Sequence, residues 1–245
     1  MKIDILGAKI NSTTMEEVIG EIKSWITYKE YWGRYICVSN VHVIMEGFDD
    51  NKFMQIINNA DIAVPDGRPL VWAQRFMGEK QSQQVRGSDL FMTLCNLSSQ
   101  YGYGIGFYGG TENVLTKLII KIKNIFPQIN ISFTHSPPFR ASTLSEDKKI
   151  IEKINSSNIK ILFVGIGCPK QEIWMQKHSN SIKCIMIGVG AAFDFISGEK
   201  KESPKWLQYI GLEWFFRFLS EPRRLFLRYF KHNPRFIWYL LKNLK

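Results

Sequence analysis

The chain has 245 residues, of which 45% are hydrophobic and 13% aromatic, so it can bury a large core and is not a disordered chain. No uninterrupted apolar run reaches the roughly 18 residues of a membrane span. The N-terminus also lacks the features of a signal peptide, so we expect the protein to stay in the cytoplasm.

Short β-rich apolar runs alternate with segments of helical periodicity through the first 203 residues. Strands are predicted at residues 35–39, 61–64, 104–108, 129–134, 159–164 and 184–189. Helices are predicted at residues 15–27, 88–99, 112–126, 145–155 and 171–178, with caps at Thr111 and within 142–145. This order predicts an α/β fold with a Rossmann-like, largely parallel sheet flanked by helices.

Several predicted strands end in loops of small or polar residues, at positions 39–42, 65–68, 109–111, 165–169 and 188–192. Open parallel sheets bind ligands beyond the carboxyl ends of their strands, where loops lead into positive helix N-termini. We therefore expect these loops to converge on one site for a nucleotide or phosphate. Glycines that only form turns would give the same pattern, and neither a Walker motif nor a Gly-x-Gly-x-x-Gly sequence is present.

The sequence changes character near residue 204. From there on, aromatic and basic side chains interleave, and residues 205–245 hold nine of the Lys and Arg residues against two Glu, while the whole chain has a net charge of +10. We predict a core, residues 1–203, and a C-terminal helical appendage, residues 204–245. Basic amphipathic helices suit the surface of an anionic membrane. A helical subdomain packed on the core is the alternative.

Two prolines are expected to divide the appendage into short helices. Pro222 and Pro234 are predicted to start new helical segments, because proline is tolerated in a first turn and disruptive inside a helix. The basic residues Lys231, Arg235 and Lys242 are predicted to lie farthest from the core.

The four cysteines, Cys37, Cys95, Cys168 and Cys184, are far apart in the sequence. They form no Cys-x-x-Cys pair, and no paired histidine spacing indicates zinc. We interpret them as reduced and mostly buried thiols.

A set of short motifs follows in order along the chain. They are Pro65-Asp-Gly67, Val85-Arg-Gly-Ser-Asp-Leu90, Gly165-x-Gly-x-Pro-x-Gln-Glu-x-Trp174, Gly188-Val-Gly-Ala-Ala-Phe-Asp-Phe-x-Ser-Gly198, and Gly211-Leu-Glu-Trp214 with Glu221-Pro-Arg-Arg224. In these motifs the chain resembles the WecG/TagA/CpsF glycosyltransferases over nearly its whole length. It departs from the family pattern at Gln84 and at Glu202, near positions where the family often has Arg.

The resemblance implies an inverting transfer of N-acetylmannosamine, its uronic acid or a related hexose from a UDP-sugar to a polyprenyl-diphosphate-linked saccharide, in cell-surface polysaccharide biosynthesis. In teichoic acid members of the family, a C-terminal appendage attaches the enzyme to the membrane and completes its active site. The implied partners are therefore the UDP-sugar, the lipid-linked acceptor and an anionic membrane surface, at the inner face of the cell membrane. Nucleic acid is not expected as a partner, and a homo-oligomer is left open.

Asp66 is the candidate catalytic base. Inverting transfer needs a group that takes the proton from the acceptor hydroxyl as that hydroxyl attacks the anomeric carbon. Asp66 follows a predicted strand within a Pro-Asp-Gly loop, at the ligand edge of the sheet. Spacing alone favours a turn aspartate bonded to its own backbone, whereas the resemblance favours catalysis.

Other polar residues near the predicted strand ends are candidates for substrate binding. Gln171 starts a helix after a glycine-rich loop and can present its amide to the nucleotide or sugar, whereas Glu172 is interpreted as a first-turn helix carboxylate. Asp194 either binds a sugar hydroxyl or holds its loop. Asn40 and His42 either contact substrate or are structural.

The remaining substrate-binding candidates are Arg86, Gly109, Gly110, Gly167 and Arg228. No Asp-x-Asp motif is present to hold a metal at the leaving diphosphate, so metal-independent chemistry without a cofactor is expected. Guanidinium groups of Arg217, Arg224 and Arg228 are predicted to stabilise the diphosphate instead, with Arg217 and Arg224 counted as catalytic. Contact with lipid headgroups or solvent is the alternative.

Two other classes of protein fit parts of the pattern. A nucleotide-dependent oxidoreductase would share the alternating strands and helices, but the missing glycine fingerprint argues against it. An RNA-binding protein would share the basic aromatic appendage. However, aromatic residues at helical spacing are more typical of a buried or membrane-facing stripe than of a stacking platform.

Overall fold

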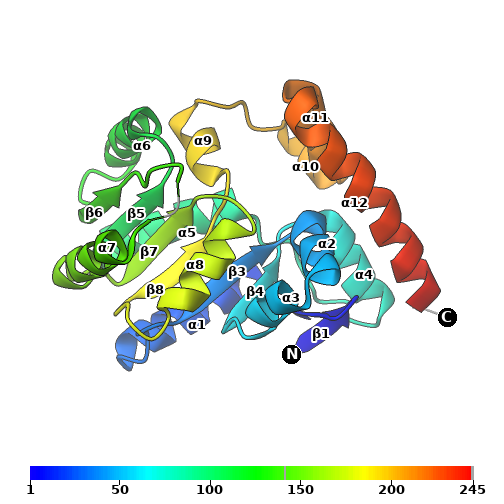
Figure 1. Ribbon diagram of the computed structural model, residues 1–245, viewed down its shortest axis with the longest axis horizontal. Helices are drawn as coiled ribbons and strands as arrows, with labels where there is room; N and C mark the ends of the chain where they lie inside the picture. Colours follow the sequence, from blue (N-terminus) through cyan, green and yellow to red (C-terminus); the bar gives the residue numbers. More distant parts are fainter. Residues whose placement is uncertain (141, 244–245) are drawn as a thin grey trace.

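The computed structural model describes residues 1–140 and 142–243, and its centre is a six-stranded parallel sheet (Figure 1). From one edge to the other the strands are β4 (Ile62–Pro65), β3 (Tyr35–Ser39), β8 (Ile185–Gly188), β7 (Ile161–Gly165), β5 (Ile105–Gly109) and β6 (Ile131–His135). All six predicted strands are present, so the predicted parallel α/β sheet is confirmed.

Helices cover both faces of this sheet (Figure 1). In the core they are α1 (Met15–Thr27), α2 (Val41–Asp49), α3 (Asn51–Asn58), α4 (Arg68–Phe76), α5 (Gly87–Tyr101), α6 (Glu112–Ile125), α7 (Leu144–Ser156), α8 (Lys170–His178) and α9 (Ala192–Ser197). The five predicted helices correspond to α1, α5, α6, α7 and α8. Thr111 caps α6 by accepting a hydrogen bond from the Val114 N–H (3.3 Å), as predicted.

Strand β3 shows why the apolar runs are continuous. All five of its residues are buried, because each face of the strand packs against a separate hydrophobic cluster. Ile36 and Val38 point into one cluster, while Tyr35 and Cys37 point into the other. A strand covered on both faces needs apolar residues at every position, which is typical of parallel sheets. All four cysteines are free, and all but Cys168 are buried.

The first 80 residues contain elements that the sequence did not predict. A hairpin of β1 (Lys2–Ile5) and β2 (Ala8–Asn11) lies beside β4, where the Asn11 side chain accepts a hydrogen bond from the Ala63 N–H (2.9 Å). The expected loop at residues 39–42 is also wrong in part, since α2 already begins at Val41. Asn40 caps this helix by accepting from the N–H groups of His42 (3.1 Å) and Val43 (3.3 Å).

The appendage consists of α10 (Lys205–Tyr209), α11 (Glu213–Ser220) and α12 (Pro222–Asn243). Pro222 starts α12, as predicted, but the prediction of a new segment at Pro234 is wrong because α12 continues through it. Buried side chains on both sides of this proline, His232 and Phe236, pack the helix onto the core and offset the lost backbone hydrogen bond. The division of the chain at residue 203 remains a prediction.

Helix α12 lies along α2 and is tied to it by ion pairs (Figure 1). Asp49 at the end of α2 binds Arg235 (2.6 and 3.0 Å) and Lys231 (3.1 Å). The expectation that these two basic residues lie farthest from the core is therefore wrong. Their charges are used to hold the appendage in place.

Candidate active site

Two adjoining cavities lie at the carboxyl ends of β4, β3, β8 and β7. Four of the five predicted loops converge there, whereas the loop at residues 109–111 lies outside the described linings, so that part of the prediction is wrong. The smaller has a volume of about 170 Å³ and is lined by glycine-rich loops, and the larger has a volume of about 470 Å³ and is lined mainly by apolar side chains. The residues common to both linings are Asn40, Asp66, Glu213, Arg217 and Arg228. The two cavities therefore share one polar junction.

Asp66 lies at this junction, directly after β4. Its backbone N–H donates to the Ser39 carbonyl (2.7 Å), and its Oδ1 accepts from the Gly87 N–H (3.1 Å), so the carboxylate is fixed in place. The Gln84 side chain donates to the Asp66 carbonyl. Burial and the nearby Glu213 carboxylate raise the pKa of Asp66 to about 6, against the opposing effects of Arg86 and the Gly87 N–H. A carboxylate with such a pKa can accept a proton near neutral pH.

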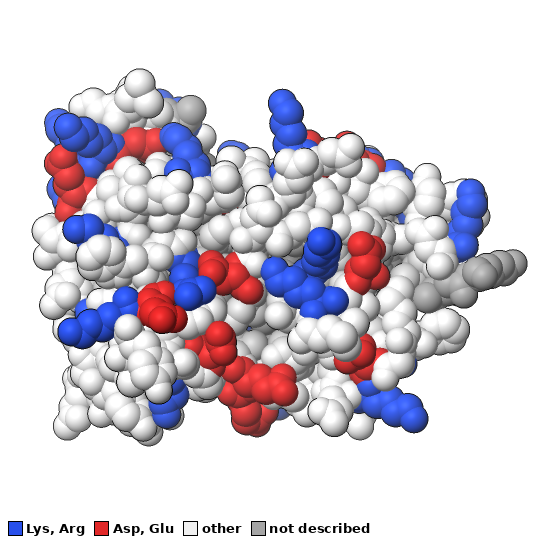
Figure 2. Space-filling model, turned by 90° about the horizontal axis from the view of Figure 1, so that it is seen from below, with Lys and Arg blue, Asp and Glu red and all other residues white. Residues whose placement is uncertain are grey.

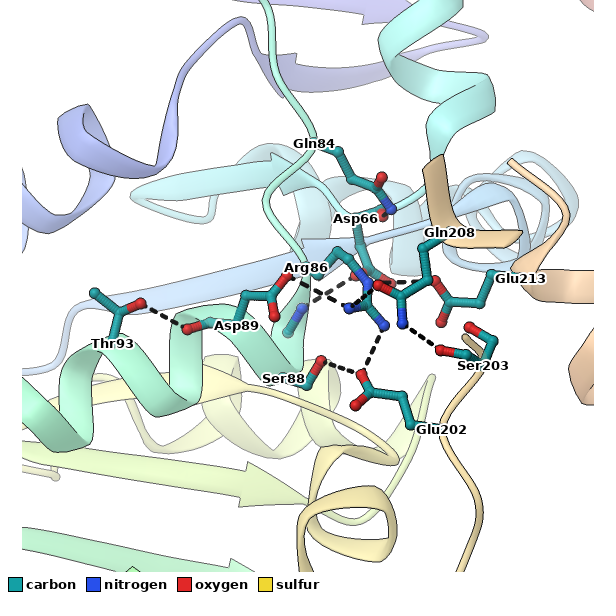
Figure 3. Close-up of polar contacts among 11 residues, drawn as sticks. Asp66, Gln84, Arg86, Ser88, Asp89, Thr93, Glu202, Ser203, Gln208 and Glu213 are labelled. Atoms are coloured by element: carbon teal, nitrogen blue, oxygen red, sulfur yellow. Dashed lines mark hydrogen bonds and ion pairs between the residues drawn. The ribbon is translucent and has the colours of Figure 1, made fainter. Parts of the chain in front are cut away.

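Arg86 links this loop to the appendage (Figure 3). Its guanidinium group binds Glu202 (2.8 Å), Gln208 (2.7 Å) and Glu213 (3.3 Å), and the Gln208 amide in turn donates to the Ser203 carbonyl (2.6 Å). The Arg86 residue is only 8% exposed. Its hydrogen-bonding groups are thus committed to protein partners, and the structure shows it holding Glu213 beside Asp66.

Three arginines of the appendage enter the smaller cavity: Arg217, Arg224 and Arg228. The Nε atoms of Arg217 and Arg228 are buried without a hydrogen-bond partner among the described residues. Burial and the neighbouring guanidinium groups lower the pKa of Arg228. Of these three arginines, Arg224 alone forms an ion pair with a carboxylate of the described residues, Glu221 (2.5 Å). A group of cations with unused donors is suited to binding an anion such as a diphosphate.

Gln171 also lines the smaller cavity, but its amide is engaged by the protein. Its Oε1 accepts from the Gly190 N–H (3.1 Å), and its Nε2 donates to Glu172 (2.8 Å). Burial raises the pKa of the fully buried Glu172 to about 6. A Cβ atom on residue 188 would come within 2.9 Å of the Met175 side chain and 3.0 Å of this amide, so Gly188 leaves room for the contact. The Gln171 and Glu172 pair thus holds the loop after β8 against the loop after β7.

The structure separates the sequence-predicted residues into two groups. At the cavities lie Asn40, Asp66, Arg86, Gly167, Gln171, Arg217, Arg224, Arg228 and, at the larger cavity alone, His42. Gly109, Gly110 and Asp194 lie outside the described lining of both. Gly109 passes so close to Gly165 that a Cβ would meet its backbone at 2.5 Å, and Asp194 pairs with Lys200 (2.8 Å).

Sequence reasoning missed the site roles of three polar residues: Glu213 at the junction, and Gln208 and Glu202, which bind Arg86. Glu213 stands in one of the quoted motifs, but it was counted only as one of the two acidic residues of the appendage. Its partner Arg86 is 127 positions earlier in the chain, so no local spacing could reveal the contact. An aromatic and aliphatic wall of the larger cavity was also missed and includes Trp72, Phe76, Leu212, Leu240 and Leu241.

A parallel sheet with a glycine-lined cavity at its carboxyl edge, a carboxylate of raised pKa and a cluster of arginines defines an enzyme that acts on a nucleotide-activated substrate. Comparison of the sequence narrows this class. The chain belongs to the glycosyl transferase WecG/TagA/CpsF family, whose family model matches residues 3–245.

Curated relatives support the same family over most of the chain. A protein of Bacillus spizizenii (strain W23) is 25% identical over 236 residues, which cover 94% of this chain and 89% of the relative. A protein of Staphylococcus aureus (strain MW2) is 26% identical over 225 residues, covering 91% of this chain and 87% of the relative. Both are named N-acetylglucosaminyldiphosphoundecaprenol N-acetyl-beta-D-mannosaminyltransferase.

Proposed function

We propose that this chain transfers N-acetylmannosamine, or a closely related hexose, from a UDP-sugar to a polyprenyl-diphosphate-linked saccharide with inversion at the anomeric carbon. The observation that carries the proposal is the meeting of Asp66, a carboxylate of raised pKa, with Arg217 and Arg228, whose Nε atoms have no hydrogen-bond partner among the described residues. The names of the two relatives supply the sugar and the acceptor type.

The smaller cavity suits the nucleotide end of the donor. Glycines at positions 167, 188 and 190 leave the backbone open to close approach, and Arg224 and Arg228 stand at the same cavity to face the diphosphate. In the reaction the bond between the sugar C1 and the UDP oxygen breaks. The negative charge that develops on UDP is stabilised by these arginines and Arg217.

The larger cavity suits the acceptor. Asp66 and Glu213 lie at its polar end, and Trp72, Phe76 and Leu241 line its apolar part. The acceptor hydroxyl forms the new bond to C1 while its proton passes to an Oδ atom of Asp66. The apolar wall accommodates the first isoprene units of the lipid, so that the diphosphate lies near the junction.

The appendage is proposed to bind to the anionic inner face of the cell membrane. None of the helices within residues 1–140 and 142–243 has the length and apolarity to cross a bilayer. However, the appendage exposes large apolar side chains, including Trp206, Tyr209, Leu227, Phe230 and Trp238, each more than half exposed. The face of the molecule in Figure 2 is not uniformly basic, because acidic side chains lie among the basic ones.

The direct test mixes the full-length protein with UDP-N-acetylmannosamine and a short-chain lipid diphosphate bearing N-acetylglucosamine, and measures released UDP and the disaccharide product. Asp66→Asn should reduce turnover by about 100-fold or more while UDP still binds, because the amide keeps the shape but cannot act as a base. Asp50→Asn, at the exposed cap of α3, is the matched control. Absence of UDP release with N-acetylmannosamine, its uronic acid and related UDP-hexoses would overturn the proposal.

A further inference from the structure

A second group of polar side chains lies where α12 crosses α2. His42 and Glu46 stand one turn apart on α2, and His232 faces them from α12. One potential ligand atom from each lies within 4.8 Å of the other two, and within residues 1–140 and 142–243 no other set of three such residues meets this condition. The sequence could not reveal this group, since His232 is far from the other two in the chain.

The geometry of the group approaches that of a metal site. The Glu46 Oε1 atom is 3.6 Å from His42 Nδ1 and 3.3 Å from His232 Nε2. In a tetrahedral zinc site with bonds of about 2.1 Å, neighbouring ligand atoms are about 3.4 Å apart. Both of these distances are close to this value, and the ring centroids of the two imidazoles are 5.2 Å apart.

Both imidazoles are available to bind a cation. The Nδ1 atom of His42, which faces Glu46, is buried without a hydrogen-bond partner among the described residues. His232, whose Nε2 atom faces Glu46, is only 3% exposed. A metal binds an imidazole through a ring nitrogen that carries no proton, and both rings present a nitrogen towards Glu46.

The Glu46 carboxylate lacks a cation of its own. Within the described part of the chain its ion-pair contacts are only the two histidines, while Lys231 and Arg235 are paired with Asp49. The groups in contact with the Glu46 carboxylate are thus two imidazoles rather than a lysine or arginine. A divalent cation would use all three groups as ligands.

We propose that His42, Glu46 and His232 bind a divalent transition metal of the zinc class, which fastens helix α12 to helix α2. This site would lie apart from the leaving diphosphate, and the proposal does not depend on the proposed function. Arg228 precedes His232 by about one turn of α12, so a bound metal would also fix the position of that arginine at the two cavities. The positive charges of the nearby Arg228 and Lys231 repel a metal cation, so we expect micromolar rather than tighter affinity.

The first test uses the full-length protein freed of metal with a chelator. Zinc at about a hundredfold excess over its dissociation constant should raise the midpoint of thermal unfolding by about 5–10 °C, and magnesium should not. Cobalt should bind with one equivalent per chain and show the visible absorption of a tetrahedral site. No zinc-dependent shift and no cobalt absorption in the wild-type chain would overturn the proposal.

Variants locate the site. Glu46→Gln and His232→Gln should both abolish the cobalt absorption and the zinc shift, whereas His135→Gln, a histidine on β6 outside the group, should keep both. The change at the buried His232 could impair folding by itself. Glu46 is partly exposed, so Glu46→Gln should fold and still decides whether the site binds metal. Metal binding that survives the Glu46 change would overturn the site. An unfolding midpoint that responds to pH between about 5 and 7 but not to zinc would show a histidine–carboxylate ion pair instead, and would also overturn it.

Discussion

Asp66→Asn should make the protein more stable at neutral pH while making it inactive. In the folded protein, burial and Glu213 raise the pKa of Asp66 from 3.8 to about 6. At pH 7.5 the wild-type chain must therefore hold an ionised carboxylate in a site that favours the neutral form. Asparagine is neutral, has nearly the same shape and can still accept the hydrogen bond from the Gly87 N–H.

The size of the effect follows from the difference between the folded and unfolded pKa. A difference of about two units corresponds to about 3 kcal/mol at a pH above both values, and imperfect replacement by the amide reduces the expected gain to about 2–3 kcal/mol. For a chain of this size, such an increase in the free energy of unfolding raises the midpoint of thermal unfolding by about 5–10 °C.

The gain should depend on pH with a definite sign. The folded pKa is raised, so the wild-type penalty is complete above about pH 6 and shrinks as the pH falls towards 4, where Asp66 is protonated in both states. Thermal or denaturant unfolding at several pH values measures this directly. Asp50→Asn should change stability by less than about 0.5 kcal/mol at every pH, because asparagine caps a helix as well as aspartate. Destabilisation by Asp66→Asn at pH 7.5, or a gain that is the same at pH 4, would refute the reasoning.

The turnover of the wild-type enzyme should fall as the pH is lowered, with a midpoint at about pH 6, because Asp66 acts as a base only when ionised. Glu213→Gln should move this midpoint to lower pH, because the Glu213 carboxylate raises the pKa of Asp66. A flat profile between about pH 5 and 7 would argue against Asp66 as the base. Added magnesium or manganese should change turnover by less than about twofold, and a tenfold stimulation would place a metal at the diphosphate. Arg217→Ala should slow turnover on a detergent-soluble acceptor by about 100-fold. By contrast, Arg223→Glu and Lys242→Glu should weaken binding to anionic vesicles in a salt-sensitive way and leave that turnover unchanged, and equal vesicle binding would contradict a membrane role.

The sheet could be predicted because its strands have one dominant requirement, burial on both faces. The prediction for β3 has the same bounds as the strand in the structure, and so has the prediction for α1, whose buried residues recur at helical spacing. Short elements carry less signal. The strands of the N-terminal hairpin have four residues each, and α3 has eight, so their patterns are too brief to separate from loops.

Part of the site could be predicted for a different reason. Parallel strands bring their carboxyl ends to one edge, so Asn40, Asp66 and Gln171 were expected near one another without any knowledge of distances. The position of α12 follows no such rule. Its course along α2 depends on contacts between distant residues, such as Arg235 with Asp49, which are 186 positions apart. For the same reason the role of Lys231 was misjudged, and the histidine group between these helices was not foreseen.

The contact between Arg86 and Glu213 joins the appendage to the proposed catalytic residue Asp66. Helix α11 brings Glu213, which raises the pKa of Asp66 and also pairs with Arg86, the residue that lowers the pKa of the same carboxylate. The same helix brings Arg217 to the cavity. In the proposed mechanism, a core without α11 would therefore have a weaker base and fewer cations for the leaving group. Both deficits arise from one docking event, so catalytic competence and the placement of the appendage are physically coupled.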